Sequence, residues 1–290
     1  MYLCTRYEKT KINEYILSFA LVFVTLQAEK ERIKMESLKK VYEAIKNNGF
    51  DRQTIELIDN YANNIQDGKA NFYRFNLSEH AGLCKAGKVL IGASIVASYA
   101  TESLTASSNV EGGEGKPANW QIDELQEELI EQWTKAAQLW VDDSEQILTE
   151  TFGPKIAQGA EAKVYYKEGD NSVVKERASI YSTTQKALDA IVLHNYLFPE
   201  TTMHVVGFTR DSDGLLRIIL TQPYVCCKRL ATKEEIDNMV FAKGFHDNWS
   251  GQGVNYVSDR MALEDLHPAN VFIDEISSKP ICIDCIVKFV

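Results

Sequence analysis

The chain has 290 residues, of which 45% are hydrophobic and 25% charged, and its formal net charge is −10 at pH 7. This composition is ordinary for a globular protein, and the length suits one large domain or two ordinary ones. The acidic balance excludes nucleic acid as the default partner, because phosphate binding requires a basic surface. The six cysteines are scattered along the chain, so we expect reduced thiols and a cytoplasmic location.

An apolar stretch at residues 15–26 is the one candidate for targeting. It is shorter than the roughly 20 apolar residues that a membrane-spanning helix needs, so we expect no membrane partner. Basic residues precede it as in a signal peptide, but acidic residues dilute that charge and no small-residue cleavage site follows. Two interpretations stay open: a buried helix, or an over-extended translation start that makes residues 1–34 non-native.

The first half of the chain is predicted to be mainly helical. A helix is expected from Met35 to Asn47, ended by Asn48-Gly49, and a second short helix follows Asp51. No clear pattern is visible in residues 71–99. Residues 106–119 are rich in Gly, Ser, Asn and Pro, which predicts a loop or linker.

A strong amphipathic helix is predicted from Gln121 to Gln138. Its apolar stripe includes Trp133, for which core packing is favoured over an exposed partner-binding surface. The texture changes after residue 150, where short β-type runs separated by turns begin. We therefore divide the chain into a mainly helical region, residues 1–150, and an α+β domain, residues 151–290.

The second half predicts an ordered series of strands and helices. Three strands are followed by a helix and two further strands, and a short helix with a capping box and a β-hairpin come later. In chain order these are strands 155–157, 163–166 and 172–175, helix 184–197, strands 204–209 and 215–221, helix 232–243, and strands 271–273 and 281–283.

A loop before the last hairpin carries the side chains of a phosphoryl-transfer site. Asp265 and Asn270 lie five residues apart, and Asp284 follows the hairpin between apolar neighbours. In such a site one carboxylate orients the attacking hydroxyl, while an amide and a second carboxylate hold Mg²⁺ on the nucleotide. We expect Asp265 to be catalytic and Asn270 and Asp284 to bind the metal, although a loop with exposed polar residues remains the simpler alternative.

Weaker motifs precede this loop. Residues 157–164 resemble a phosphate-covering loop, with Gly159 and Val164 in matching positions and alanines at the outer glycine positions. The strand that follows contains Val173-Val174-Lys175, which is similar to the strand that carries the phosphate-binding lysine. A plain β-turn and an exposed lysine are the alternative interpretations.

Together these motifs resemble the protein-kinase-like fold, and the whole of residues 151–290 resembles the Ser/Thr/Tyr kinase-like domain of polyvalent proteins from phages and conjugative elements. The resemblance implies a two-lobed domain with a minimal C-terminal lobe, preceded by the helical region. It implies ATP and Mg²⁺ as cofactors and a catalytic role for Lys175. It places the nucleotide against Gly159, Val164 and Lys175, and against a hinge formed by Gln222, Tyr224 and Val225.

The resemblance also shows departures from the kinase pattern. The helix 184–197 contains no glutamate, so Asp189 is the expected acidic partner of Lys175. The sequence ends six residues after Asp284, which leaves no room here for the segment that usually binds the phosphate acceptor. We expect phosphoryl transfer to a protein or small-molecule hydroxyl. A nucleotide-binding pseudokinase serving as an interaction module of a mobile element is the alternative, and transfer of a nucleotide also stays open.

The pair Cys282 and Cys285 has the C-x-x-C spacing of metal and redox sites. If both residues lie in one strand, alternation directs their side chains to opposite faces. Packing is therefore the favoured role, and a zinc or redox site is the minority interpretation.

Overall fold

The computed structural model describes residues 38–67, 87–110, 117–159, 161–248 and 254–290. The apolar segment at residues 15–26 lies outside them. The described residues form two compact units, divided between Gly49 and Phe50. In the first unit a helix spans residues 38–48 and ends at Gly49, whose φ is +63° and whose N–H donates to the Ile45 carbonyl at 2.9 Å. The predicted end of this helix is confirmed.

Among its described residues, the second unit begins with helices α2 (Arg52–Gln66), α4 (Lys88–Val110) and α5 (Asn119–Ala136). Asp51 caps α2 by accepting a hydrogen bond from the Thr54 N–H at 2.7 Å, which is the capping pattern expected of an aspartate. The predicted helices after Asp51 and from Gln121 are confirmed. Trp133 is only 1% exposed, so its core role is confirmed as well.

Helix α4 corrects the predicted loop and occupies part of a stretch for which no element was predicted. It begins inside the stretch that showed no pattern, and it continues to Val110 through the first part of the predicted loop. The reason is that residues 90–97 are buried on every side, so they show no apolar stripe. By length and composition the segment Lys88–Ser107 could cross a membrane, but half of it is buried inside the protein, as in the core helix of a globular domain.

Five antiparallel strands form the first sheet, in the order β1-β2-β3-β5-β4. They are β1 (Lys155–Gln158), β2 (Ala162–Tyr165), β3 (Ser172–Ala178), β4 (His204–Arg210) and β5 (Leu216–Pro223). Helix α7 (Thr184–Leu197) connects β3 to β4, and its bounds match the prediction. The sequence did not predict α6 (Ser144–Phe152), which covers the sheet through a core of Leu148, Tyr165, Val174 and Ile219.

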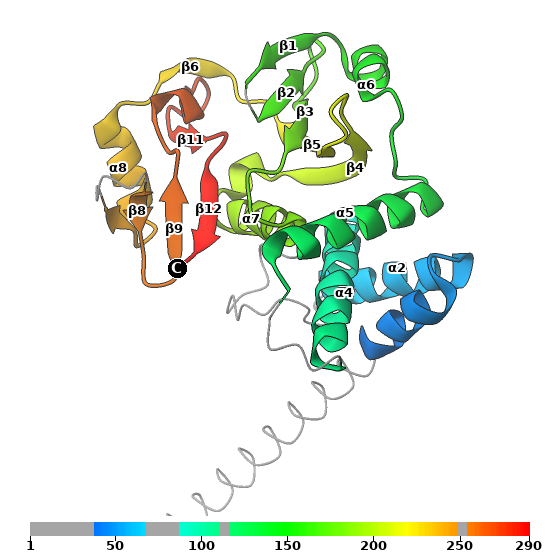
Figure 1. Cartoon of the computed structure of the whole chain (residues 1–290). Helices are drawn as coiled ribbons and strands as arrows, with labels where there is room; N and C mark the ends of the chain where they lie inside the picture. Colours follow the sequence, from blue (N-terminus) through cyan, green and yellow to red (C-terminus); the bar gives the residue numbers. More distant parts are fainter. Residues whose placement is uncertain (1–37, 68–86, 111–116, 160, 249–253) are drawn as a thin grey trace, which may run out of the picture. The chain divides into compact units, whose positions relative to one another are not determined.

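Helix α7 also packs on α4 and α5 (Figure 1). The buried Gln126 of α5 links all three helices, because its amide donates to Thr101 of α4 at 2.9 Å and its oxygen accepts from the Gln185 N–H of α7 at 2.9 Å. Arg210 of β4 pairs with Glu127 and Glu131 of α5 at 2.7 Å each. A buried hydrogen-bond network therefore joins α5 to α4 and α7, and partly buried ion pairs join α5 to the sheet.

The described part of the chain also contains two further antiparallel sheets, with orders β11-β10-β6 and β12-β9-β8-β7. Their core includes Phe198, Tyr256, Leu263, Val271 and Val287. The elements are β6 (Cys227–Leu230), α8 (Lys233–Phe241), β7 (His246–Asp247), β8 (Val254–Val257), β9 (Met261–Glu264), β10 (Val271–Asp274), β11 (Pro280–Cys282) and β12 (Ile286–Phe289), with 3₁₀ turns η1 (Pro199–Thr201) and η2 (Pro268–Asn270). Helices mixed with antiparallel sheets confirm the α+β class.

The predicted capping box of α8 is present. The Thr232 hydroxyl accepts from the Glu235 N–H, and the Glu235 carboxylate accepts from the Thr232 N–H at 2.8 Å. Hydrogen bonds from Arg229 and then from the Thr232 backbone lower the pKa of Glu235 to about 2. Since the folded pKa lies below the unfolded value of about 4.3, ionised Glu235 stabilises the fold above that value.

We expect Glu235→Gln to lower the free energy of unfolding at pH 7, and the difference from wild type to disappear as the pH falls from about 4 towards 2. Urea unfolding across this pH range measures the effect. Glu234→Gln removes the same charge one residue earlier and is the control. A difference between Glu235→Gln and wild type that does not change with pH contradicts the prediction.

Candidate functional site

The loop after β9 holds Asp265 and Asn270 side by side. Asp265 has a φ of 57°, a left-handed conformation that Asp and Asn tolerate better than most residues. The Asn270 amide donates to the Asp265 carbonyl at 2.9 Å and to its carboxylate at 3.0 Å. His267 Nε2 lies 3.3 Å from the other carboxylate oxygen. The loop therefore presents an exposed carboxylate whose orientation is set by its neighbours.

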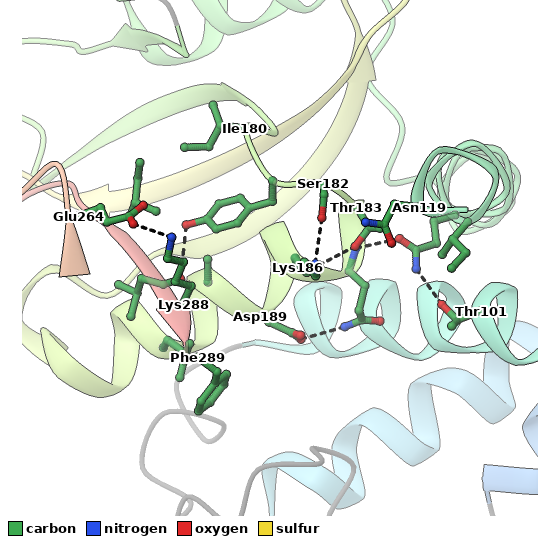
Figure 2. A pocket seen from close by; sticks show the side chains of 18 residues that line it. Thr101, Asn119, Ile180, Ser182, Thr183, Lys186, Asp189, Glu264, Lys288 and Phe289 are labelled. Carbon is green, nitrogen blue, oxygen red and sulfur yellow. Dashed lines mark hydrogen bonds and ion pairs between the residues drawn. The ribbon is translucent and has the colours of Figure 1, made fainter. Parts of the chain in front are cut away.

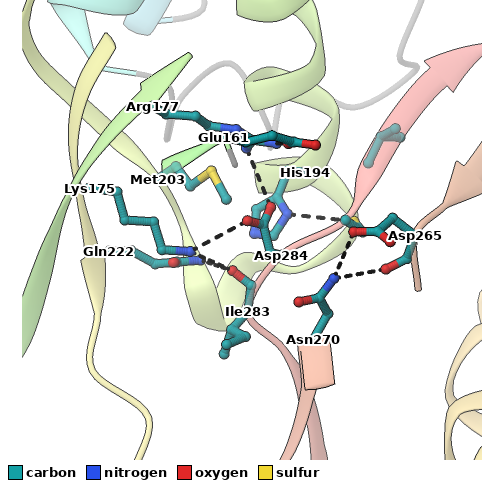
Figure 3. A network of polar contacts seen from close by, with 12 residues as sticks. Glu161, Lys175, Arg177, His194, Met203, Gln222, Asp265, Asn270, Ile283 and Asp284 are labelled. Carbon is teal, nitrogen blue, oxygen red and sulfur yellow. Dashed lines mark hydrogen bonds and ion pairs between the residues drawn. The ribbon is translucent and has the colours of Figure 1, made fainter. Parts of the chain in front are cut away.

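Asp284 lies next to this loop because the two segments are joined through their backbones. The Ile283 N–H donates to the Asn270 carbonyl at 2.9 Å. On its other side the Ile283 carbonyl accepts from Lys175 Nζ at 3.0 Å, and Lys175 Nζ lies 3.9 Å from an Asp284 oxygen. Figure 3 shows Lys175 of β3, Asp265 and Asn270 of the loop after β9, and Asp284 after β11 lying close together. The structure thus brings four predicted site residues together.

Sequence reasoning missed Arg177 and Glu161. Arg177 NH1 lies 3.4 Å from Asp284 Oδ1, and its NH2 lies 4.0 Å from Glu161, which is in the turn between β1 and β2 (Figure 3). Alternation along β3 puts residues 175 and 177 on one face, and this signal could have indicated Arg177. The buried side chains of Lys175 and Arg177 therefore both face Asp284, the carboxylate expected to bind the metal.

These charges shift the pKa values of the site. Burial alone raises the pKa of Asp284, but Arg177 and Lys175 outweigh it and leave that pKa below its ordinary value. Burial lowers the pKa of Lys175 despite the nearby Asp284. Burial, with Asp284 and Asp265 nearby, raises the pKa of Glu161 against the opposing effect of Arg177. Asp284 therefore remains ionised and can bind a cation at neutral pH.

Asp189 does not take the expected place beside Lys175. Among the described residues Lys175 makes no ion pair with Asp189, and its carboxylate contact is Asp284. Asp189 accepts from the Gln185 side chain at 2.9 Å and lines a cavity of about 630 Å³ between α4, α5, α7 and β12 (Figure 2). The reason is helical geometry: this face of α7 turns towards α4 and α5.

The hinge residues are present at the end of β5, but two of them are already engaged. The buried Gln222 amide donates to the carbonyls of Thr201 and Ile283 at 3.0 Å each, so it supports the strand beside Lys175. The Tyr224 N–H donates to the Asn171 carbonyl at 2.9 Å, and its ring stacks on Tyr166 with centroids 4.4 Å apart. The backbone N–H groups of Tyr224 and Val225 are the hinge donors that could bind adenine, and these bonds leave that of Val225 unused.

The predicted phosphate loop is the hairpin between β1 and β2. The Gly159 N–H donates to the Ala162 carbonyl at 2.9 Å, and Val164 pairs with Lys175 across β2 and β3. A Cβ added at Gly159 would have no atom within 4 Å. The hairpin is therefore in register with the lysine strand, while contacts within the protein do not require glycine at its tip.

The structure corrects the expectation that the side chains of Cys282 and Cys285 point to opposite faces of one strand. Strand β11 ends at Cys282, and residues 283–285 are not in a strand, so Cys282 and Cys285 turn to the same side. Both thiols and a ring nitrogen of His194 lie within 4.8 Å of one another, and all three residues are buried. Hydrogen bonding from Cys282 lowers the pKa of Cys285 to about 6, whereas burial raises the pKa of Cys282.

The donor set beside the loop fits a hard divalent cation. Within the described part of the chain, the buried Asp284 Oδ1 has no hydrogen-bond partner, and its contact with Arg177 is purely ionic. Asn270 donates through its nitrogen to Asp265, which leaves its carbonyl oxygen as an acceptor. A carboxylate and an amide oxygen are the protein ligands that Mg²⁺ takes alongside phosphate oxygens.

This arrangement of lysine, loop carboxylate, amide and second carboxylate is that of a kinase-family domain. A family model described as Serine/Threonine/Tyrosine Kinase found in polyvalent proteins matches residues 123–290, more than half of the chain. The chain belongs to this family, as its motifs indicated. No curated protein matches the chain.

Proposed function

We propose that this protein is an ATP- and Mg²⁺-dependent phosphotransferase with a kinase-like, two-lobed fold and a short C-terminal lobe. The observation that carries the proposal is the convergence of Lys175, Asp265, Asn270 and Asp284 from elements far apart in the chain. The hydrogen bond from Lys175 Nζ of β3 to the Ile283 carbonyl also supports it, because it joins the first sheet to the turn that carries Asp284.

Each residue has a distinct role in the proposed reaction. Asp265 accepts the proton of the acceptor hydroxyl and orients it for attack. Asn270 and Asp284 would hold Mg²⁺, which neutralises charge on the phosphates. Lys175 holds the α and β phosphates. Because its ammonium group is buried, its electrostatic interaction with the phosphates is stronger than in water. The remaining rate enhancement comes from positioning and charge stabilisation.

The acceptor is proposed to be a hydroxyl on a protein or on a small molecule. The described cysteines Cys226, Cys227, Cys282 and Cys285 are free thiols, which suits the reducing cytoplasm where ATP is abundant. The family description, kinases of polyvalent proteins, supports a role in a mobile element.

One observation favours the alternative, a pseudokinase that binds nucleotide without transfer. Arg177 already places a positive charge 3.4 Å from the Asp284 oxygen that Mg²⁺ would bind. A guanidinium fixed at this position takes the place of Mg²⁺ beside Asp284 and lowers the affinity of the site for Mg²⁺. In the phosphotransferase, Arg177 must move towards Glu161 when nucleotide and Mg²⁺ bind.

The experiment separates these outcomes. Purified protein is incubated with γ-³²P-ATP, with and without Mg²⁺, alone and with a bacterial lysate, and thermal unfolding is measured with ATP under the same conditions. Label transfer that requires Mg²⁺ supports the phosphotransferase. Stabilisation by ATP without transfer supports the pseudokinase. If the protein shows neither label transfer nor stabilisation by ATP, both functions are ruled out. Labelling from α-³²P-ATP instead would identify transfer of the nucleotide.

Lys175→Met is expected to weaken ATP binding at least about tenfold, because a charge-assisted contact to phosphate is worth roughly 1.5–3 kcal/mol. The ATP-induced rise in melting temperature, titrated over ATP concentration, measures the change. Lys167→Met, at an exposed lysine outside the site, is the control. Equal ATP affinity in the two variants would remove Lys175 from the nucleotide site.

A further inference from the structure

A buried cluster of soft ligands lies directly beside the proposed phosphotransfer site. It consists of His194 from the last turn of α7, Cys282 at the end of β11, and Cys285 before β12. Their exposed fractions are 2%, 0% and 4%. A Cys-x-x-Cys pair and a histidine 88 residues earlier are thus brought together by tertiary packing alone.

The hydrogen bonds of His194 fix which ring nitrogen faces the thiols. Nε2 lies 3.2 Å from the Thr201 carbonyl oxygen, which can only accept, so Nε2 carries the proton. In the neutral ring, Nδ1 then has a lone pair, and it lies 3.9 Å from Cys285 Sγ. A backbone carbonyl that holds the distal N–H in this way is the usual support of a metal-binding histidine.

The spacing and charge also suit a metal ion. Ligand atoms around a tetrahedral zinc ion lie about 3.6 Å apart. The separation of His194 Nδ1 and Cys285 Sγ is 3.9 Å, and all three ligand atoms lie within 4.8 Å of one another. Two thiolates and a neutral imidazole carry two negative charges, which a divalent cation cancels. A neutral complex is the form in which such charges can be buried.

We propose that His194, Cys282 and Cys285 form a binding site for a thiophilic divalent cation, with Zn²⁺ as the physiological ion. Three protein ligands leave the fourth tetrahedral position to a water molecule or another exogenous ligand. Because the two cysteines bracket Asp284, the bound cation holds the turn that carries this carboxylate. The site is distinct from the proposed Mg²⁺ position and does not depend on phosphoryl transfer.

The test is a metal titration of the full chain, reduced and stripped of metal. Co²⁺ is the probe, because tetrahedral coordination by thiolates produces visible and near-ultraviolet absorption. We expect one Co²⁺ per chain, displacement by Zn²⁺, and a higher melting temperature with Zn²⁺. Cys282→Ser, Cys285→Ser and His194→Gln should each lower the affinity by more than about 100-fold, since even supporting residues contribute 10–100-fold.

The double substitution Cys226→Ser/Cys227→Ser is the matched control, because it removes an adjacent pair of thiols outside the cluster and should leave the titration unchanged. A second measurement does not depend on how the variants fold. Wild-type protein is alkylated with and without Zn²⁺, and each cysteine is read by peptide mass spectrometry. Zn²⁺ should protect Cys282 and Cys285 but not Cys227. Absence of protection, or a Cys282–Cys285 disulfide that forms equally with and without Zn²⁺, overturns the proposal.

Discussion

Asp265→Asn is expected to reduce phosphoryl transfer by about 10²–10⁴-fold while ATP binding is retained. The substitution removes the proton acceptor, and general-base catalysis contributes a factor of this size. Asparagine is the appropriate replacement because Asp265 has a φ of 57°, a conformation that asparagine tolerates and alanine does not. Its carbonyl oxygen can still accept the hydrogen bond from Asn270.

Initial rates of label transfer at saturating ATP measure this effect, and thermal stabilisation by ATP with Mg²⁺ reports binding. Asp259→Asn, in the exposed turn before β9, makes the same chemical change outside the site and should behave like wild type. If Asp265→Asn transfers phosphate within about threefold of wild type, Asp265 is not the catalytic base.

The second large effect concerns stability. Trp133→Ala should lower the free energy of unfolding by about 3–5 kcal/mol, the range for removal of a buried tryptophan. Trp133 is 1% exposed and lies against α4 at Gly92, where an added Cβ would stand 2.6 Å from the indole ring. Because the backbone of α4 lies so close to the indole ring, the cavity created by Trp133→Ala can collapse only slightly.

Trp120→Ala is a control on the same helix, because Trp120 is 66% exposed and its loss should change stability by less than about 0.5 kcal/mol. Urea unfolding followed by far-ultraviolet circular dichroism measures both variants without relying on tryptophan fluorescence. A loss below about 1 kcal/mol for Trp133→Ala would show that α4 and α5 do not depend on this contact.

The packing of α4 and α5 also bears on the domain boundary. The family match begins at residue 123, inside α5, whereas the expected kinase-like domain begins at residue 151. Gln126, Asp123 and Arg210 connect α5 to α7 and β4. We therefore propose that α5 stabilises the lysine-bearing sheet, and that a fragment starting at residue 151 would lose these contacts.

The sequence by itself determined what depends on neighbours along the chain. The bounds of α7, the succession of strands and helix along residues 155–223, the capping box of α8 and the spacing of Asp265, Asn270 and Asp284 all follow local patterns. Hydrophobic periodicity, turn residues and caps act within a few residues of each other, so they are visible without a structure.

Tertiary structure alone decided which side chains meet across the fold. Arg177 rather than Asp189 faces the charges around Asp284, because the rotation of α7 on α4 and α5 turns Asp189 away. The buried residues 90–97 of α4 showed no periodicity, and the strand break after Cys282 set the two thiols beside His194. These outcomes depend on helix rotation and chain reversal, which arise from packing between distant segments and leave no local pattern in the sequence.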